Sequence, residues 1–362
     1  MKIVILNWRC IKNPDMGGSE IYFYELAKRW VKNGNQVNWF SPMFKNSLKE
    51  EEIDGIKFIR GGRKYTGYIY SMFNYLKSSK DFDIVIDVEN GIPFFSPLYI
   101  KNKKVFLHIH HIHKDVWFKQ MPLPIALIGY ILETKFMPLV YKNKQIITLS
   151  KSSYDEIIKE KISKLEPKII NPGIEFYKHK KAQKSKNPTI LFLNRIKKYK
   201  GIDTLLKATK ELKNNNIIFW IAGDGDYLEK SKRYIKYNNL NNVILFGRIS
   251  EEKKCELMQK AWIFVNPSYK EGWGIVNIEA NYFGTPVIGS NVQGIKDSVI
   301  DGKTGLLFEY GNHKDLIKKI NQLLNNRKEL NNMSKNAKKW AKNFNWDKKA
   351  KEYLNIFNYL SK

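Results

Sequence analysis

The stretch from Pro267 to Gly289 constrains the fold more than any other part of the sequence. The apolar run Ile263–Ser268 that leads into it predicts a buried strand ended by a proline and a serine. A Gly-Trp-Gly turn at 272–274 follows, then an apolar run with helical spacing, and Thr285–Asn291 predicts the next strand. A strand, a glycine loop, a helix and a second strand in this order are typical of a parallel sheet.

Two carboxylates flank that glycine turn, at Glu271 and Glu279. Eight helical residues rotate about 80° past two full turns, so the two side chains would not share a helix face. We therefore place Glu271 in the loop and Glu279 early in the helix, where both can point toward a ligand at the strand ends. Gly272 and Gly274 allow close backbone approach beside the free N–H groups of a helix start. Carboxylates accept hydrogen bonds from hydroxyls and repel phosphate, which suits a sugar or ribose. Ordinary solvated glutamates are the alternative.

Length and composition place limits on the class of protein. The 362 residues suffice for two domains, and a hydrophobic content of 43% excludes a disordered chain. Cys10 and Cys255 are too far apart for a disulfide framework or a metal-ligand motif, which suits a reducing compartment. We expect no signal peptide before the first predicted strand, because no charged region with a cleavage site precedes it. The apolar run Met121–Leu132 is short and contains two prolines, so we do not expect an integral membrane protein.

The net charge of +28 indicates an anionic partner. Residues 101–200 hold 22 Lys and Arg against 7 Asp and Glu, an excess of 15 charges in this segment. Nucleic acid, acidic lipid and a phosphorylated substrate all fit this excess. Alternatively, the positive charge reflects an AT-rich genome that produces a lysine-rich, solvated surface, and has no functional meaning.

The chain repeats one pattern twice. In the first half, the strand Lys2–Trp8 is followed by Gly17-Gly18 and by an amphipathic helix that ends at Gly34, an arrangement that can hold phosphate. Further strands are predicted at Gln36–Pro42, Gly55–Gly61, Asp81–Asn90, Lys104–His113 and Gln145–Leu149. The polar, basic segment Tyr177–Pro188 is the best candidate for a linker. The pattern then restarts at Thr189, which predicts two α/β halves with a crevice between them.

Four histidines end the predicted strand Lys104–His113. Alternation places His108 and His110 on one face, and His111 and His113 on the other. No other ligand type clusters with them in the sequence, so we do not expect a metal site. The apolar segment Trp117–Val140 that follows predicts either a pair of core helices or a surface that meets lipid.

Two cations stand at the end of the first strand of the second half, at Arg195 and Lys200. Arginine can donate two hydrogen bonds to phosphate oxygens, and lysine supplies a point charge. Together with the N–H groups of Gly17-Gly18, they could hold a diphosphate. Asp224 and Asp226 flank a glycine, but not in the pattern that holds a divalent cation on a diphosphate. We therefore expect the two cations to neutralise a leaving diphosphate without a metal.

These residues in this order resemble the retaining glycosyltransferases of family 4, also called glycosyl transferases group 1, which have two facing Rossmann-like domains (the GT-B fold). The resemblance covers essentially the whole chain. The family's Glu-x7-Glu motif matches Glu271 and Glu279, its arginine and lysine match Arg195 and Lys200, and its Gly-Asp-Gly matches Gly223, Asp224 and Gly225. Its glycine pair matches Gly17 and Gly18, and its histidine matches His110, or His111 if the alignment shifts by one residue. Asn194 stands where the family often has glycine.

The resemblance implies the site and the reaction. The catalytic residues would be His110, Arg195, Lys200 and Glu271. The donor would be bound by Gly17, Gly18, Arg195, Lys200, Gly223, Asp224, Glu271, Gly272, Trp273, Gly274 and Glu279. Glu271 would contact the hydroxyls of the transferred sugar and Glu279 the ribose. The donor would be a UDP- or GDP-sugar, with no metal and no other cofactor.

The implied domains are 1–176 for the acceptor and 177–343 for the nucleotide sugar, with a helix at 344–362 that crosses back to the first domain. The acceptor would be a lipid-linked or cell-envelope glycan, and the protein would be cytoplasmic and peripheral on an anionic membrane. Two alternatives remain. A sugar-nucleotide epimerase of the same fold fits the Glu-x7-Glu motif poorly. A nucleic-acid-binding protein would explain the charge but not the carboxylates, and no recognition motif is present, so nucleic acid is not an expected partner.

Overall fold

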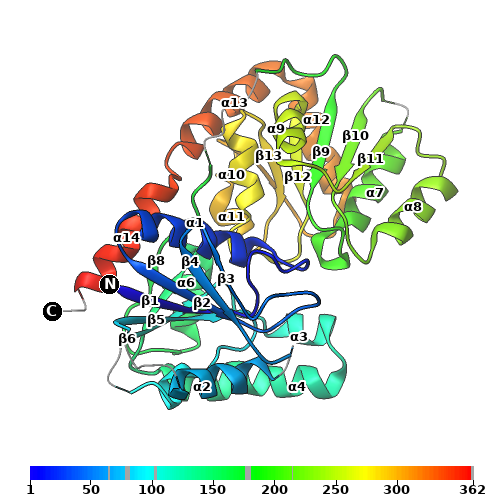
Figure 1. Cartoon of the computed structure of the whole chain (residues 1–362). Helices are drawn as coiled ribbons and strands as arrows, with labels where there is room; N and C mark the ends of the chain where they lie inside the picture. Colours follow the sequence, from blue (N-terminus) through cyan, green and yellow to red (C-terminus); the bar gives the residue numbers. More distant parts are fainter. Residues whose placement is uncertain (64–65, 78–81, 102–103, 176–180, 214, 360–362) are drawn as a thin grey trace. The chain divides into compact units, whose positions relative to one another are not determined.

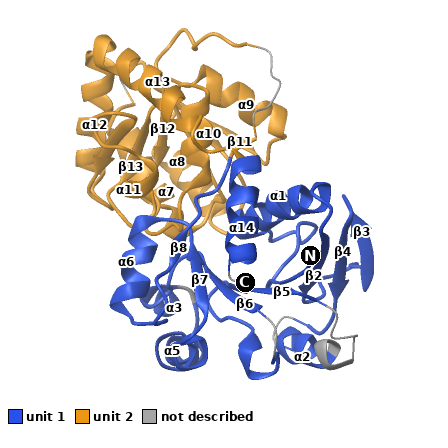
Figure 2. Ribbon diagram, turned by 90° about the vertical axis from the view of Figure 1, so that its left-hand side faces the viewer, with its two compact units in different colours: residues 1–173, 346–362 blue, residues 174–345 orange. Residues whose placement is uncertain are grey.

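The computed structural model describes residues 1–63, 66–77, 82–101, 104–175, 181–213 and 215–359. The chain forms two compact units, 1–173 with 346–362 and 174–345 (Figures 1 and 2). Each unit is an α/β body built on its own largely parallel sheet, as the sequence predicts. The chain passes between units at 173/174 and 345/346, where the sequence placed the boundaries at 176/177 and 343/344.

Unit 1 contains an eight-stranded sheet in the order β3-β4-β2-β1-β5-β6-β7-β8. The strands are β1 (Lys2–Leu6), β2 (Gln36–Ser41), β3 (Glu50–Ile53), β4 (Ile56–Arg60), β5 (Ile84–Glu89), β6 (Lys104–Ile109), β7 (Gln145–Thr148) and β8 (Lys168–Ile169). All pairs are parallel except β3 with β4. The sequence analysis missed β3, whose three glutamates lack strand propensity. Asp54 and Gly55 both have positive φ in the tight turn that joins it to β4.

Helices cover both faces of this sheet. They are α1 (Gly18–Lys32), α2 (Gly67–Lys77), α3 (Asp115–Gln120), α4 (Leu123–Ile131), α5 (Met137–Tyr141), α6 (Lys151–Lys159) and α14 (Trp346–Tyr359), with a 3-10 turn η1 (Ser96–Leu98) and a π-helical turn η2 (Leu132–Phe136). The C-terminal helix α14, red in Figure 1, packs on α1. Trp30 Nε1 donates to the Ala350 carbonyl at 3.1 Å. This contact explains why α14 belongs to unit 1 although it follows unit 2 in the chain.

Unit 2 contains a six-stranded parallel sheet in the order β11-β10-β9-β12-β13-β14. The strands are β9 (Thr189–Leu193), β10 (Ile218–Ala222), β11 (Val243–Gly247), β12 (Ile263–Asn266), β13 (Val287–Ser290) and β14 (Gly305–Phe308). The helices are η3 (Lys198–Lys200), α7 (Ile202–Glu211), α8 (Leu228–Tyr237), α9 (Glu251–Lys260), α10 (Ile275–Tyr282), α11 (Ile295–Ser298), α12 (His313–Asn325) and α13 (Arg327–Ala341). Successive residues of β9 point into the hydrophobic cores on opposite faces of the sheet. Ile190 and Phe192 belong to one core, and Leu191 belongs to the other.

Two sequence expectations need correction. Part of the predicted linker, 177–180, lies outside the described residues. The rest is not a free linker, because Ala182 N donates to Gln259 Oε1 and Ser185 N to the Lys260 carbonyl, both at 3.0 Å within unit 2. The second correction concerns length: α4, η2 and α5 form a continuous apolar helix, Leu123–Tyr141, of 19 residues, long and apolar enough to cross a membrane.

This helix is nevertheless packed into unit 1. The Tyr141 hydroxyl contacts the buried carboxylate of Asp87 on β5. Ala126, Glu133 and Met137 are also buried. A polar network and buried side chains of this kind are typical of a surface helix that packs on a core with one side.

Candidate functional site

The strand order of unit 2 brings the predicted donor residues to one place. β9 and β12 are neighbours in the sheet. The chain continues from β9 to β10 on one side, and from β12 to β13 on the other. The connections therefore diverge between β9 and β12, and such a switch point is where open α/β sheets bind ligands beyond the carboxyl ends of their strands. Arg195 and Lys200 follow β9, and Glu271 follows β12.

The two sides of this switch point are joined by an ion pair between Lys200 and Glu271. The Lys200 side chain is only 7% exposed and that of Glu271 16% exposed. The loops are also linked through their backbones, because Tyr269 N donates to the Tyr199 carbonyl at 2.8 Å. Gly201 makes this approach possible: a Cβ there would lie 1.9 Å from the Pro267 carbonyl oxygen.

Arg195 lies in the same loop as Lys200 but has a different partner. Its guanidinium Nη2 donates to the Tyr199 hydroxyl at 3.2 Å. The Gly-Asp-Gly turn after β10 supports this loop from the other side. A Cβ at Gly223 would lie 1.9 Å from the Asn194 carbonyl oxygen, and Ile196 N donates to the Asp224 carbonyl at 2.8 Å. The turn therefore needs glycine for close packing, and the Asp224 side chain is exposed.

The glycine loop after β12 is held by a second loop, which the sequence analysis did not identify. Glu271 N donates to the Gln293 carbonyl at 3.3 Å, and a Cβ at Gly294 would lie 2.1 Å from the Glu271 carbonyl oxygen. Gly274, with a φ of +84°, is the N-cap of α10. The Trp273 ring is buried, and its Nε1 has no hydrogen-bond partner. The only sequence signal for the supporting loop was the glycine at 294.

Glu279 lies on α10 as predicted, but as the fifth of its eight residues, later in the helix than the sequence analysis placed it. Its carboxylate accepts from Lys254 Nζ on α9 at 2.9 Å, and Lys254 also pairs with Glu251 at 2.6 Å. Lys254 is thus a further cation of this region that the sequence analysis missed. Nothing in the sequence distinguishes it from its neighbour Lys253.

The predicted phosphate-binding glycines of unit 1 lie at the corresponding switch point, between β1 and β5. Gly17 is the N-cap of α1, but its N–H already donates to Glu20 Oε2 at 2.6 Å. Asn90, directly after β5, donates to Asn7 Oδ1 at 2.8 Å and to Ser19 Oγ at 3.1 Å. The glycine pair therefore borders a polar network rather than open N–H groups alone.

The histidines follow the predicted pairing, although β6 ends at Ile109, so that His108 lies within the strand and the other three follow it. The rings of His108 and His110 are 4.6 Å apart, and those of His111 and His113 stack at 4.6 Å. His110 is 7% exposed and its Nε2 has no hydrogen-bond partner. Burial lowers the pKa of His110 to about 3, so its ring is neutral at pH 7. His111 is less buried.

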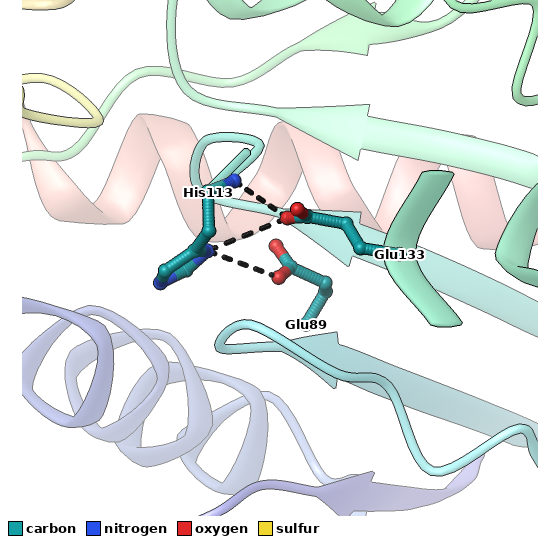
Figure 3. A group of neighbouring side chains, drawn as sticks. All are labelled: Glu89, His113 and Glu133. Carbon is teal, nitrogen blue, oxygen red and sulfur yellow. Dashed lines mark hydrogen bonds and ion pairs between the residues drawn. The ribbon is translucent and has the colours of Figure 1, made fainter. Parts of the chain in front are cut away.

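The expectation that no other ligand type clusters with the histidines is wrong. Glu89 from β5 and Glu133 from η2 lie beside His113, and a ligand atom of each lies within 4.8 Å of the others (Figure 3). The side chains of both glutamates are fully buried. These two carboxylates are distant from the histidines in the sequence, so no local pattern links the three residues.

Comparison with known families covers nearly the whole chain. Residues 16–176 match the family described as Glycosyltransferase Family 4, and residues 173–340 match Glycosyl transferases group 1. The uncharacterized glycosyltransferase MJ1069 of Methanocaldococcus jannaschii is 29% identical over 96% of both chains. A second one from that organism, MJ1178, is 35% identical over 47% of this chain and 48% of its own, about half its length. The capsular polysaccharide biosynthesis glycosyltransferase CapM of Staphylococcus aureus is 30% identical over 55% of this chain and 57% of its own.

Solved structures share the fold. Sucrose-phosphate synthase from Thermosynechococcus elongatus has a TM-score of 0.82 at 21% identity, covering 99% of this chain and 98% of that one. Anabaena HepE, solved in complex with UDP and glucose, has a TM-score of 0.77 at 17% identity and covers 99% of each chain. Both confirm two Rossmann-like units of the GT-B type.

Proposed function

The chain belongs to the family 4 glycosyltransferases (glycosyl transferases group 1), and from this premise we propose that it moves a hexosyl group from a nucleoside-diphosphate sugar to a glycan acceptor with retention of anomeric configuration. The observation that carries the donor site is the buried Lys200–Glu271 pair at the switch point of unit 2. It supplies a cation for phosphate and a carboxylate for hydroxyls in direct contact. A nucleoside-diphosphate sugar offers both groups together.

When the donor binds, Lys200 and Glu271 exchange each other for groups of the donor. A diphosphate oxygen competes with Glu271 for the Lys200 ammonium group, and the released carboxylate can accept from the sugar hydroxyls. Arg195 adds a second cation to the diphosphate. As the bond from the sugar to the diphosphate breaks, negative charge grows on the leaving group, and fixed cations stabilise that charge most in the transition state.

The remaining donor contacts follow from the loop geometry. The N–H groups of 272–274 precede α10, where the helix dipole favours a phosphate oxygen. Glu279 accepts from ribose hydroxyls, with Lys254 holding its carboxylate. In unit 1, the neutral ring of His110 can donate or accept a hydrogen bond without adding charge.

The reaction proposal is tested by incubating the full-length protein with a panel of nucleotide sugars and measuring release of the free nucleoside diphosphate. Lys200→Met should lose most of the release, and Lys232→Met, which removes an exposed lysine of α8, should keep it. The anomeric configuration of the product, read by NMR, tests retention. Equal release by both variants, or an inverted product, would contradict the proposal.

We further propose that no divalent cation is needed on the diphosphate, because Arg195 and Lys200 supply its charge. The two aspartates of the turn after β10 have other contacts: Asp224 accepts from Gly225 N at 2.7 Å, and Asp226 pairs with Lys197 at 3.5 Å. Turnover after chelator treatment should not rise when magnesium or manganese is added. A loss in chelator that either ion restores would refute this part of the mechanism.

The acceptor side of the proposal rests on an exposed apolar face of unit 1. Around α3, α4 and α5, the exposed residues are Phe118, Met121, Leu123, Ile125, Leu127, Ile128, Ile131, Phe136 and Leu139, which we call the apolar face. Leu123 and Leu139 are 72% and 73% exposed. Contiguous apolar surface of this kind marks a binding site, and the excess of positive charge in 101–200 favours an acidic lipid surface. We propose that the protein binds the cytoplasmic face of a membrane here and uses a lipid-linked or cell-envelope glycan as acceptor.

Vesicle flotation tests this docking. The full-length protein should bind vesicles containing phosphatidylglycerol at low salt and much less at high salt or on phosphatidylcholine alone. Ile128→Glu with Leu139→Glu should abolish binding. Leu48→Glu, an exposed leucine of unit 1 outside the apolar face, should not change it. If the wild-type protein ignores acidic vesicles at low salt, a soluble acceptor replaces the lipid-linked one.

A further inference from the structure

Three side chains of unit 1 that the proposed transfer does not use converge in one buried cluster. Glu89 ends β5, His113 follows β6, and Glu133 lies in the π-helical turn η2. Figure 3 shows both carboxylates and the His113 Nδ1 pointing toward one another. π-Helical turns are rare and occur often at functional sites, because they rotate one residue out of the regular helix register. Here the turn carries Glu133 into the interior.

The hydrogen bonds of the cluster are uneven. Glu133 accepts three N–H groups: His113 N at 2.5 Å, Lys114 N at 2.8 Å and Trp117 Nε1 at 3.0 Å. Glu89 Oε1 accepts from Gly91 N. Glu89 Oε2 and His113 Nδ1, in contrast, are buried without a hydrogen-bond partner. A buried polar atom without a hydrogen bond costs about 1–3 kcal/mol, so Glu89 Oε2 requires an explanation, as do the ion-pair contacts of His113 Nδ1, which are longer than a hydrogen bond.

The distances indicate what is missing. His113 Nδ1 lies 3.4 Å from Glu89 Oε1 and 3.5 Å from Glu133 Oε1. A charge-assisted hydrogen bond between these groups would be about 2.7–2.9 Å long. Three ligands at about 2.1 Å from a tetrahedral zinc ion are instead about 3.4 Å from one another. The edges of an octahedron of the same radius would be shorter, about 3.0 Å.

We propose that Glu89, His113 and Glu133 bind a zinc ion. Two carboxylates and a neutral imidazole carry two negative charges, which Zn²⁺ neutralises within the buried site. A water molecule, or the second oxygen of Glu89, completes the tetrahedron. The N–H groups of Gly91, Lys114 and Trp117 hold the carboxylates in place, as outer partners do in metal sites.

Such an ion would tie together three segments that are distant in the sequence: the end of β5, the histidine loop after β6, and η2. It would thereby fix the loop that starts at His110. This role is separate from the proposed transfer, because all three ligands belong to unit 1 and the cations proposed to neutralise the diphosphate belong to unit 2. Zinc content can be measured without donor or acceptor, so either proposal can fail alone.

The experiment uses the full-length protein, stripped with a chelator and desalted. Titration with zinc chloride should show about one bound ion per chain and raise the melting temperature. His113→Gln and Glu133→Gln should each lower the zinc affinity by at least tenfold. His313→Gln is the matched control, because His313 contacts a single carboxylate, Glu211, at 2.8 Å on the surface of unit 2. It should bind zinc as the wild-type protein does.

A measurement on the unaltered protein covers the case in which a variant does not fold. Cobalt(II) added to the stripped protein should give the intense visible absorption of tetrahedral coordination, and zinc should displace it. The proposal is overturned if the stripped wild-type protein binds no stoichiometric zinc and gives no such spectrum. It is also overturned if both ligand variants bind zinc like the control. His113 would then be an imidazolium shared by the two carboxylates.

Discussion

Replacing Lys200 with methionine removes the ammonium group that Glu271 contacts and keeps a side chain of similar length. The carboxylate of Glu271, 16% exposed, would then be mostly buried without its cation. Removing one partner of a buried ion pair costs about 3–5 kcal/mol, and the residual exposure of Glu271 places the expected loss near ~3 kcal/mol. For a domain of this size, the melting temperature should fall by roughly 6–12 °C.

A double-mutant cycle separates the buried charge from other effects of the substitution. Glu271→Gln in the Lys200→Met background should recover about 1–2 kcal/mol, because no unpaired charge is then buried. Lys232→Met is the control: Lys232 and its partner Glu229 have side chains 49% and 75% exposed, so its cost should stay below about 0.5 kcal/mol. Urea unfolding followed by circular dichroism measures each free energy of unfolding.

Turnover is the second readout. Lys200→Met should lower kcat on the order of 100-fold and change the donor KM less, because the cation acts most on the charge of the leaving group. If Lys200→Met is as stable as the Lys232→Met control, or if the double variant loses the sum of both single losses, the pair is not a buried, coupled one. Near-normal kcat in Lys200→Met would refute its role in the reaction.

Three further outcomes are expected. Gly201→Ala should destabilise the protein by at least about 2 kcal/mol more than Gly302→Ala in urea unfolding. Both glycines have positive φ, but only at Gly201 would a new Cβ meet another group, the Pro267 carbonyl oxygen 1.9 Å away. Equal losses for the two variants would contradict the close packing at Gly201. The pKa of His110 is about 3 in the folded protein and ordinary in the unfolded chain, so the folded protein loses stability as the pH falls below about 6.5, by about 2 kcal/mol at pH 5. His110→Gln should reduce the loss of stability between pH 7 and pH 5 by that amount. An unchanged pH profile would show that the His110 ring is not buried. Arg195→Ala should lower kcat by about 100-fold with a smaller change in donor KM, and a change confined to KM would mean that the guanidinium binds ground state and transition state alike.

The sequence by itself determined most of the elements and their order, with β3 as an exception. Apolar runs of strand length, glycine loops and helical periodicity placed β9, β12 and α10 within a few residues, because these signals are local. They also placed Lys200 and Glu271 at strand ends. In a parallel sheet the carboxyl ends of all strands lie at one edge, so the sequence could predict that Lys200 and Glu271 both lie at that edge. The pairing of His108 with His110 followed from strand alternation in the same way.

Only the tertiary structure decided which of these ends are neighbours. β9 lies beside β12 because the sheet order reverses there, and no local pattern encodes that order. The same holds for Lys254 beside Glu279. Glu89 and Glu133 reach His113 because β5 pairs with β6 and a π-turn rotates Glu133 inward. Local sequence encodes the conformation of a segment, whereas partners distant in the chain are set by how the segments pack, and packing depends on the whole chain at once.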